Sequence, residues 1–255
     1  MQPSERRVAV VGDDRAAALR EALGRSPYRS AERSVADVVV AVGDDALRDV
    51  LLDAPDAPVI PVGSRRLAVD ADDAEGRVRT LIDAALRGDE HVDDPPVDGV
   101  QRAAHPILAV DAGDGPTRRA AFDVALVTAE PARISEFAVD FTDGPDDSFR
   151  ADGVVVATPL GSDGYANAAG GPVVEPGAGL AVTPIAPFST RTDARIVASR
   201  LSLSVERETE SVALVVDGRE RGVVTPHRSV AIEATERVTL VTLADAGRAR
   251  RSETL

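Results

Sequence analysis

The stretch "VADVVVAVGDDALRDVLL", Val35 to Leu52, decides the fold of the first part of the chain. Its first half is a valine-rich run that is typical of a strand buried on both faces. A Gly-Asp-Asp turn follows, and the second half carries leucines and valines at helical spacing. A buried strand that leads through a tight turn into an amphipathic helix predicts an α/β domain with a parallel sheet.

The same order recurs on both sides of this stretch. Upstream, "RRVAVVGDD" (Arg6 to Asp14) predicts a strand and "RAAALREAL" (Arg15 to Leu23) predicts a helix. Downstream, "APVIPVG" (Ala57 to Gly63) predicts a third strand. The segment "DDAEGRVRTLIDAALRG" (Asp72 to Gly88) then predicts a helix, because acids stand at its start and glycine at its end.

The segment "GDEHVDDPPVDG", Gly88 to Gly99, breaks this pattern with acids, prolines and glycines, which mark a domain boundary. We therefore expect an α/β domain over residues 1–92 and a second domain over residues 93–255. Valine-rich and alternating runs separated by turns predict a β-rich, sandwich-like second domain. The exception is "GYANAAG", Gly164 to Gly170, which predicts the start of a short helix.

The composition excludes several kinds of function. There is no cysteine, so disulfides and thiolate metal sites are excluded, and His91, His105 and His227 lack the spacing of a zinc site. The net charge of -14 argues against nucleic-acid binding. No apolar run is long enough for a membrane span and the N-terminus lacks the apolar core of a signal peptide. We therefore expect a cytoplasmic protein.

The acidity has a pattern of its own, because the sequence contains no lysine and its basic residues are all arginine. This pattern is expected of a halophilic protein, since the Debye length falls to about 3 Å at 1 M salt and self-repulsion is then tolerated. GC-rich codon usage, which also favours Asp, Arg, Ala and Gly, is the alternative explanation.

Two Gly-Asp-Asp turns, Gly12 to Asp14 and Gly43 to Asp45, follow predicted strands. In open α/β sheets, ligands bind at the carboxyl ends of strands. Asp is also a favoured helix N-cap, which is our interpretation of Asp13 and Asp14. Neither turn is a Walker A loop, since there is no lysine, and neither is a full dinucleotide-binding glycine fingerprint.

The stretch "ADGVVVATPLGSDGYANAAGGPVVEPGAGLAVTPIAPFS", Ala151 to Ser189, carries the most specific motif. Its ordered elements resemble the central signature of the NAD kinase family, and the later "VVDGRE", Val215 to Glu220, resembles the Asp-Gly hairpin of that family. The matching elements are Asp152-Gly153, Thr158-Pro159, Gly161-Ser162, Tyr165, Gly170-Gly171-Pro172, Thr183-Pro184-Ile185 and Pro187 with Ser189. The chain is identified as a divergent member of this family, of haloarchaeal type.

The resemblance implies an enzyme that phosphorylates the 2′-hydroxyl of the adenosine ribose of NAD to give NADP. ATP or another phosphoryl donor would be used together with Mg²⁺ or another divalent cation. Members of this family commonly form homodimers or homotetramers, so the resemblance also implies an oligomer.

The resemblance assigns roles to residues in both domains. Asp44 falls on the position of the general base, Gly43 lies beside the donor phosphates, and Asp45 is a possible metal ligand. Tyr165 would offer its ring as a wall for the nucleotide. The residues that would hold NAD are Asp123, Asp152, Leu160, Asp163, Gly164 and Tyr165.

The departures from the family pattern leave a second hypothesis open. Val42, Asp45 and Ala46 stand where the family has Gly, Gly and Thr, Asp123-Val124 stands for Asn-Glu, and Asp163 replaces a hydroxyl residue. An Asp45 carboxylate 4 Å from a phosphate charge would be repelled by about 4 kcal/mol at an effective dielectric of about 20. The alternative is therefore a weakened relative that binds NAD or NADP as a sensor or partner subunit. A lipid kinase is a third possibility, against which the second-domain signature argues.

Overall fold

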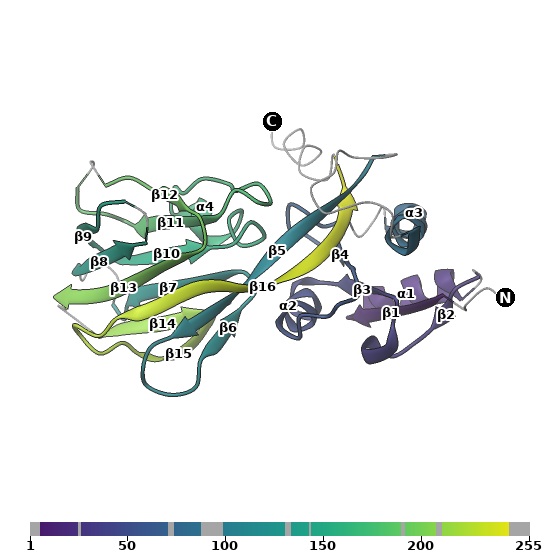
Figure 1. The fold of residues 1–255 in the computed structure, drawn as a ribbon, viewed down its shortest axis with the longest axis horizontal. Coiled ribbons are helices and arrows are strands. Elements are labelled where there is room, and N and C mark those ends of the chain that lie inside the picture. Colours follow the sequence, from purple (N-terminus) through teal and green to yellow (C-terminus); the bar gives the residue numbers. More distant parts are fainter. Residues whose placement is uncertain are drawn as a thin grey trace. The chain divides into compact units, whose positions relative to one another are not determined.

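The computed structural model describes residues 6–24, 27–70, 74–87, 99–130, 134–142, 144–189, 192–207 and 211–244. The chain forms two compact units (Figure 1). The first unit comprises residues 1–105 and 238–255, and the second comprises residues 106–237. The predicted linker lies outside the described residues except for Gly99.

The first unit is built on a parallel sheet, as its sequence predicts. The strands are β1 (Arg7–Gly12), β2 (Arg29–Ser30), β3 (Val38–Val42), β4 (Val59–Val62) and the end of β16 (Val230–Leu243). Their order is β2-β1-β3-β4-β16, with Val8 opposite Val38 and Val40 opposite Ile60. All five residues of β3 are buried, which explains why this strand is apolar on both faces.

Three helices accompany this sheet, namely α1 (Asp14–Leu23), α2 (Asp44–Leu52) and α3 (Ala74–Arg87), and a short 3₁₀ helix, η1, covers Arg33–Val35. Helix α2 buries Leu47, Val50 and Leu51, so the predicted apolar face is confirmed. Asp13 caps α1 by accepting a hydrogen bond from the Arg15 backbone N–H at 3.0 Å, as the capping interpretation expects. No helix among the described residues has the length and apolar character needed to cross a bilayer.

The second unit contains an antiparallel sheet and a second group of strands. The antiparallel sheet has the order β12 (Arg195–Val197), β11 (Leu180–Ile185), β10 (Gly153–Ala157), β7 (Asp123–Thr128), β14 (Val212–Val216) and β15 (Arg219–Val223). The second group runs β16, β13 (Arg200–Arg207), β8 (Ser135–Phe141) and β9 (Asp147–Ala151), while β5 (Val100–Asp111) pairs with β16 and with β6 (Arg118–Ala120).

Both sheets of the second unit contribute to one core. Leu126 and Val154 come from the antiparallel sheet, and Phe137 and Leu203 come from β8 and β13. All four side chains are fully buried, which confirms the predicted β-rich, sandwich-like architecture. The short helix α4 (Tyr165–Ala168) forms at the position that the sequence predicts.

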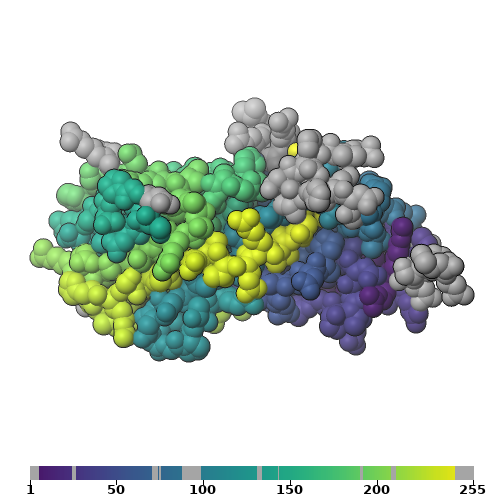
Figure 2. Space-filling model, in the orientation of Figure 1, coloured from purple at the N-terminus to yellow at the C-terminus, as the bar shows by residue number. Residues whose placement is uncertain are grey.

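Strand β16 explains why the two units differ from the predicted domains. Its first part pairs with β13, with Ile232 opposite Leu201, and Leu240 near its end pairs with Val59 of β4. Thr235–Arg237, in the middle of the strand, are exposed, and Figure 2 shows β16 in yellow at the surface. Residues 238–244 are therefore grouped with the first unit, whereas the prediction assigned residues 93–255 to one domain.

Candidate active site

Three glycines end the parallel strands of the first unit, and all three have positive φ angles. The φ angles are 139° at Gly12, 89° at Gly43 and 156° at Gly63. A Cβ atom on Gly12 would lie 2.2 Å from the Val42 carbonyl oxygen, so a side chain cannot fit between β1 and β3. These glycines let the strand ends approach one another closely.

Asp44, the predicted general base, is the first residue of α2. Gly43 precedes the helix and is held by a 2.8 Å bond from its N–H to the Val62 carbonyl. A Cβ built on Gly63 would lie 3.5 Å from Asp44 Oδ1, so the carboxylate lies directly over that glycine. The Asp44 side chain is 43% exposed, and the helix N-terminus stabilises its negative charge.

Arg65 is a residue that the sequence reasoning missed. Its Nε lies 3.2 Å from Asp44 Oδ2. The loop that carries it is held by two backbone bonds, from Ala68 N–H to the Arg65 carbonyl and from Gly63 N–H to the Val69 carbonyl, both 2.9 Å. The only signal in the sequence is that "PVGSRRLA" lacks most of the glycines that the family carries there.

Asp45 contacts a buried arginine of its own helix. Arg48 Nη1 lies 2.6 Å from Asp45 Oδ1, and Arg48 Nη2 lies 3.0 Å from Asp49 Oδ1. Burial lowers the pKa of Arg48, but the hydrogen bonds and charges of Asp45 and Asp49 more than offset it, so the pKa is raised. The Asp45 side chain is 85% exposed, which leaves its carboxylate open to solvent and to ligands.

The described residues contain no group of three or more acidic or histidine side chains that could hold a metal ion by themselves. Mg²⁺ is usually bound by one or two carboxylates together with substrate phosphates and water. The exposed Asp45 carboxylate, at the same helix end as Asp44, offers this oxygen chemistry. The residues therefore fit an ion that arrives with a nucleotide.

Thr158 fixes the start of the glycine-rich loop of the second unit by hydrogen bonds to the backbone that precedes β7. Its Oγ1 donates to the carbonyls of Ala121 and Phe122 at 2.9 and 3.0 Å, and its N–H donates to the Phe122 carbonyl at 2.8 Å. A Cβ on Gly161 would lie 2.0 Å from that same carbonyl oxygen. Ser162 is also buried, and its Oγ donates to the Pro159 carbonyl at 2.9 Å.

Tyr165, at the tip of this loop, lies within electrostatic reach of two other predicted residues. Partial burial is the largest cause that raises the pKa of its hydroxyl, and the negative charges of Asp123 and Asp152 raise that pKa further. The ring is 44% exposed and so remains open to a ligand. Of the other predicted residues, Leu160 is fully buried, whereas Gly164 is exposed. Asp163 is half-buried.

Asp217 positions the strand that begins at Asp123, a role that the sequence reasoning did not assign. Its carboxylate accepts hydrogen bonds from the backbone N–H groups of Ala121, Phe122 and Asp123 at 2.9, 2.7 and 3.1 Å. Its own N–H donates to the Asp123 carbonyl at 2.9 Å. The signal was present in the Asp-Gly hairpin "VVDGRE", but the sequence does not show what the Asp binds.

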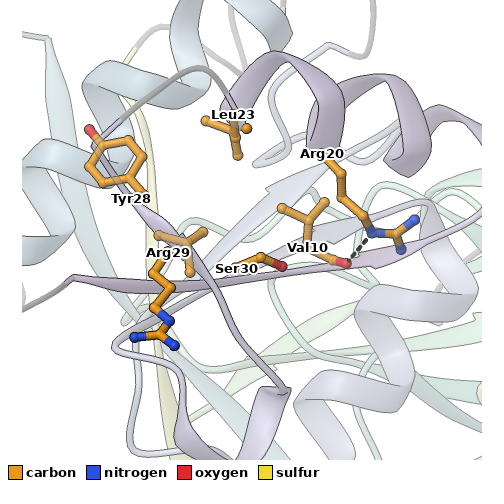
Figure 3. Close-up of a pocket in the computed structure, with 8 residues that line it drawn as sticks. Val10, Arg20, Leu23, Tyr28, Arg29 and Ser30 are labelled. Carbon is orange, nitrogen blue, oxygen red and sulfur yellow. Dashed lines mark hydrogen bonds between the residues drawn. The ribbon is translucent and has the colours of Figure 1, made fainter.

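A small hollow lies between α1 and the β1–β2 edge (Figure 3). Val10, Leu23 and Tyr28 supply apolar and aromatic walls, and Arg20 Nε donates to the Val10 carbonyl at 2.9 Å. Its volume of about 50 Å³ is far below the roughly 300 to 1,000 Å³ of ligand pockets. None of the predicted site residues lines it, so it is a packing hollow and not the candidate site.

Comparison with known proteins supports the resemblance to the NAD kinase family that the sequence motifs indicate. Residues 123–242 match the family model described as the ATP-NAD kinase C-terminal domain. An NAD kinase from Methanoculleus marisnigri is 40% identical over 96 residues, which cover 37% of this chain and only 36% of that protein. An NAD kinase from Methanocorpusculum labreanum is 27% identical over 207 residues, covering 78% of this chain and 71% of that protein.

A solved structure extends the likeness over the whole chain. The crystal structure of an NAD kinase from Archaeoglobus fulgidus in complex with ATP aligns with a TM-score of 0.72 and 25% sequence identity. The alignment covers 97% of this chain and 98% of that one. Residues 123–242 therefore match the ATP-NAD kinase C-terminal domain, and the fold of the chain is similar to that of an NAD kinase over 97% of its length.

Proposed function

We propose that this protein is an NAD kinase, which transfers a phosphoryl group from ATP to the 2′-hydroxyl of the adenosine ribose of NAD. The observation that carries this proposal is the Asp44 carboxylate, which stands at the N-terminus of α2 directly over Gly63. A carboxylate in this place can accept a proton, while the N-terminus of α2 beside it can receive phosphates.

The first unit would supply the chemistry of the transfer. Asp44 accepts the proton of the 2′-hydroxyl as the ribose oxygen forms a bond to the γ-phosphorus. The bond between that phosphorus and the bridging oxygen of ADP breaks, so the products are NADP, ADP and a proton. The protein contributes mainly position and electrostatics, as in other phosphoryl transfers.

A divalent cation such as Mg²⁺ belongs to this proposal. The cation supplies charge neutralisation on the phosphates, and the exposed Asp45 carboxylate would hold it together with those phosphates. A cation between Asp45 and the polyphosphate would also reduce the repulsion between their negative charges. Asp45 is thus compatible with catalysis although the family has glycine there.

The second unit would hold NAD. Tyr165 offers a half-exposed ring against which a flat base or pyridine ring can pack. The carboxylates of Asp123 and Asp152, which both influence the Tyr165 hydroxyl, can accept hydrogen bonds from ribose hydroxyls or an amide. Thr158, Gly161 and Asp217 keep the loop and the start of β7 in place.

A direct assay tests this proposal against the alternative of a weakened binding protein. The purified protein is incubated with NAD, ATP and Mg²⁺ in molar KCl, and NADP is measured with an NADP-specific dehydrogenase. Omission of ATP and addition of EDTA are the controls. We expect NADP that accumulates in proportion to the protein. Calorimetry that shows NAD binding while no NADP forms at high protein concentration would contradict the proposal and favour the sensor or partner subunit.

We also propose that the protein works in the cytoplasm as a homodimer or homotetramer. The resemblance to the family supports the oligomer, and the acidic, lysine-free composition supports an environment rich in salt. Light scattering coupled to size-exclusion chromatography in molar KCl measures the mass directly. A mass equal to the 26.6 kDa of one chain would contradict the oligomer.

A further inference from the structure

We propose that Arg65 binds the polyphosphate of the phosphoryl donor, and that it exchanges its contact with Asp44 for phosphate when the donor arrives. The inference rests on the proposed function and names a binding residue for it. It starts from one ion pair, between Arg65 Nε and Asp44 Oδ2 at 3.2 Å.

The loop after β4 holds Arg65 in a fixed place. The backbone bond from Gly63 N–H to the Val69 carbonyl closes the loop, and Val69 N–H donates to the Pro61 carbonyl, both at 2.9 Å. Thr242 Oγ1 on β16 adds a hydrogen bond to the Leu67 carbonyl at 2.5 Å. The guanidinium therefore starts from a pinned backbone, and only its side chain has to move.

The charges around Asp44 create a need for a cation. Two Gly-Asp-Asp turns bring four carboxylates to the carboxyl ends of β1 and β3, and a polyphosphate would add several negative charges. Arg48 is 7% exposed and holds Asp45 and Asp49. Arg65 contacts Asp44 from the loop that follows β4.

The ion pair with Asp44 is suited to exchange. It joins Arg65 Nε to an Asp44 carboxylate that is 43% exposed, while the Arg65 side chain is 18% exposed. A guanidinium can instead make two parallel hydrogen bonds to a phosphate, which are stronger. Once Arg65 has turned to the phosphate, both oxygens of Asp44 are available to accept the proton of the ribose hydroxyl.

Calorimetric titration with tripolyphosphate and Mg²⁺ tests the binding role without a nucleotide base or turnover. We expect Arg65→Ala to weaken binding by about tenfold or more, and Arg65→Lys to recover part of the loss. The matched control is Arg7→Ala, which breaks the 2.7 Å ion pair with Asp37 at the opposite end of β1 and should leave the affinity within about twofold.

A second variant separates binding from a merely structural role. Asp44→Asn removes the competing carboxylate and one repelling charge, so it should tighten tripolyphosphate binding, and the gain should be clearly smaller when Arg65→Ala is combined with it. Arg65→Ala with normal affinity, a wild-type protein that does not bind tripolyphosphate, or a gain of equal size with and without Arg65 would each overturn the inference. NADP formation is measured separately: its absence with Arg65-dependent binding contradicts only the proposed kinase activity.

Discussion

Gly161→Ala should destabilise the second unit strongly, because the new methyl group would clash with a backbone atom. An ideal Cβ at this position lies 2.0 Å from the Phe122 carbonyl oxygen, whereas a normal carbon–oxygen contact is about 3.3 Å or longer. The two groups would have to separate by about 1.3 Å, given that normal contact. The obstacle is a backbone atom, so no side-chain rotation can relieve the clash.

The magnitude follows from what holds the carbonyl. It accepts hydrogen bonds from Thr158 N–H at 2.8 Å and from Thr158 Oγ1 at 3.0 Å, so moving it weakens both. Two hydrogen bonds at about 1 kcal/mol each, with an overpacking cost of about 1 to 3 kcal/mol, give a loss of about 3 to 5 kcal/mol.

Urea unfolding followed by circular dichroism measures this loss. The midpoint should fall by about 1 M or more, given typical denaturant slopes. Gly115→Ala is the control, because a Cβ there meets nothing within 4 Å and its φ is not in the left-handed region. We expect that control to stay within about 0.5 kcal/mol of the wild type. A Gly161→Ala protein that loses less than about 1 kcal/mol would refute the reasoning.

Two further predictions concern polar groups. Asp217→Asn leaves one acceptor oxygen for three backbone N–H groups. We therefore expect a loss of about 2 to 3 kcal/mol in the free energy of unfolding, measured in urea, and weaker NAD binding in calorimetry. Unchanged stability would count against the role of the carboxylate. Burial first, and then the hydrogen bond and charge of Asp83, raise the pKa of Tyr28 to about 12. Because the folded pKa lies above the ordinary value of 10.0, the stability that Tyr28 contributes is fully present below pH 10 and is lost as the pH rises toward 12. The Tyr28 side chain is only partly buried, so solvent screening limits this contribution to at most about 1 kcal/mol. Tyr28→Phe should therefore lose less stability than the wild type between these pH values, and equal losses would exclude this cause.

The local patterns of the sequence were enough for the elements of the first unit. The valine run of β3 and the leucine spacing of α2 predict which side chains are buried, because both patterns are visible within a few residues. The same holds for the order of glycine and small residues that led to the family and to the short helix α4. These features depend on neighbours in the chain.

The features that escaped prediction join residues that are far apart in the sequence. Asp217 binds the backbone of Ala121 to Asp123 across more than 90 positions, and Arg65 meets Asp44 across 21. The pairing of the 14-residue strand β16 escaped prediction for the same reason, since it pairs with β13 at one end and with β4 near the other. A periodic pattern within one segment does not show which distant segment it contacts.

Asp44→Asn tests the central claim most directly, when NADP formation and NAD affinity are measured on the same preparation. The change keeps the size of the side chain but removes the proton acceptor, and the loss of a positioned base costs about 10² to 10⁴-fold in rate. NAD affinity, measured by calorimetry, should stay close to that of the wild type, because Tyr165, Asp123 and Asp152 are untouched. An Asp44→Asn protein that forms NADP at the wild-type rate would contradict the account.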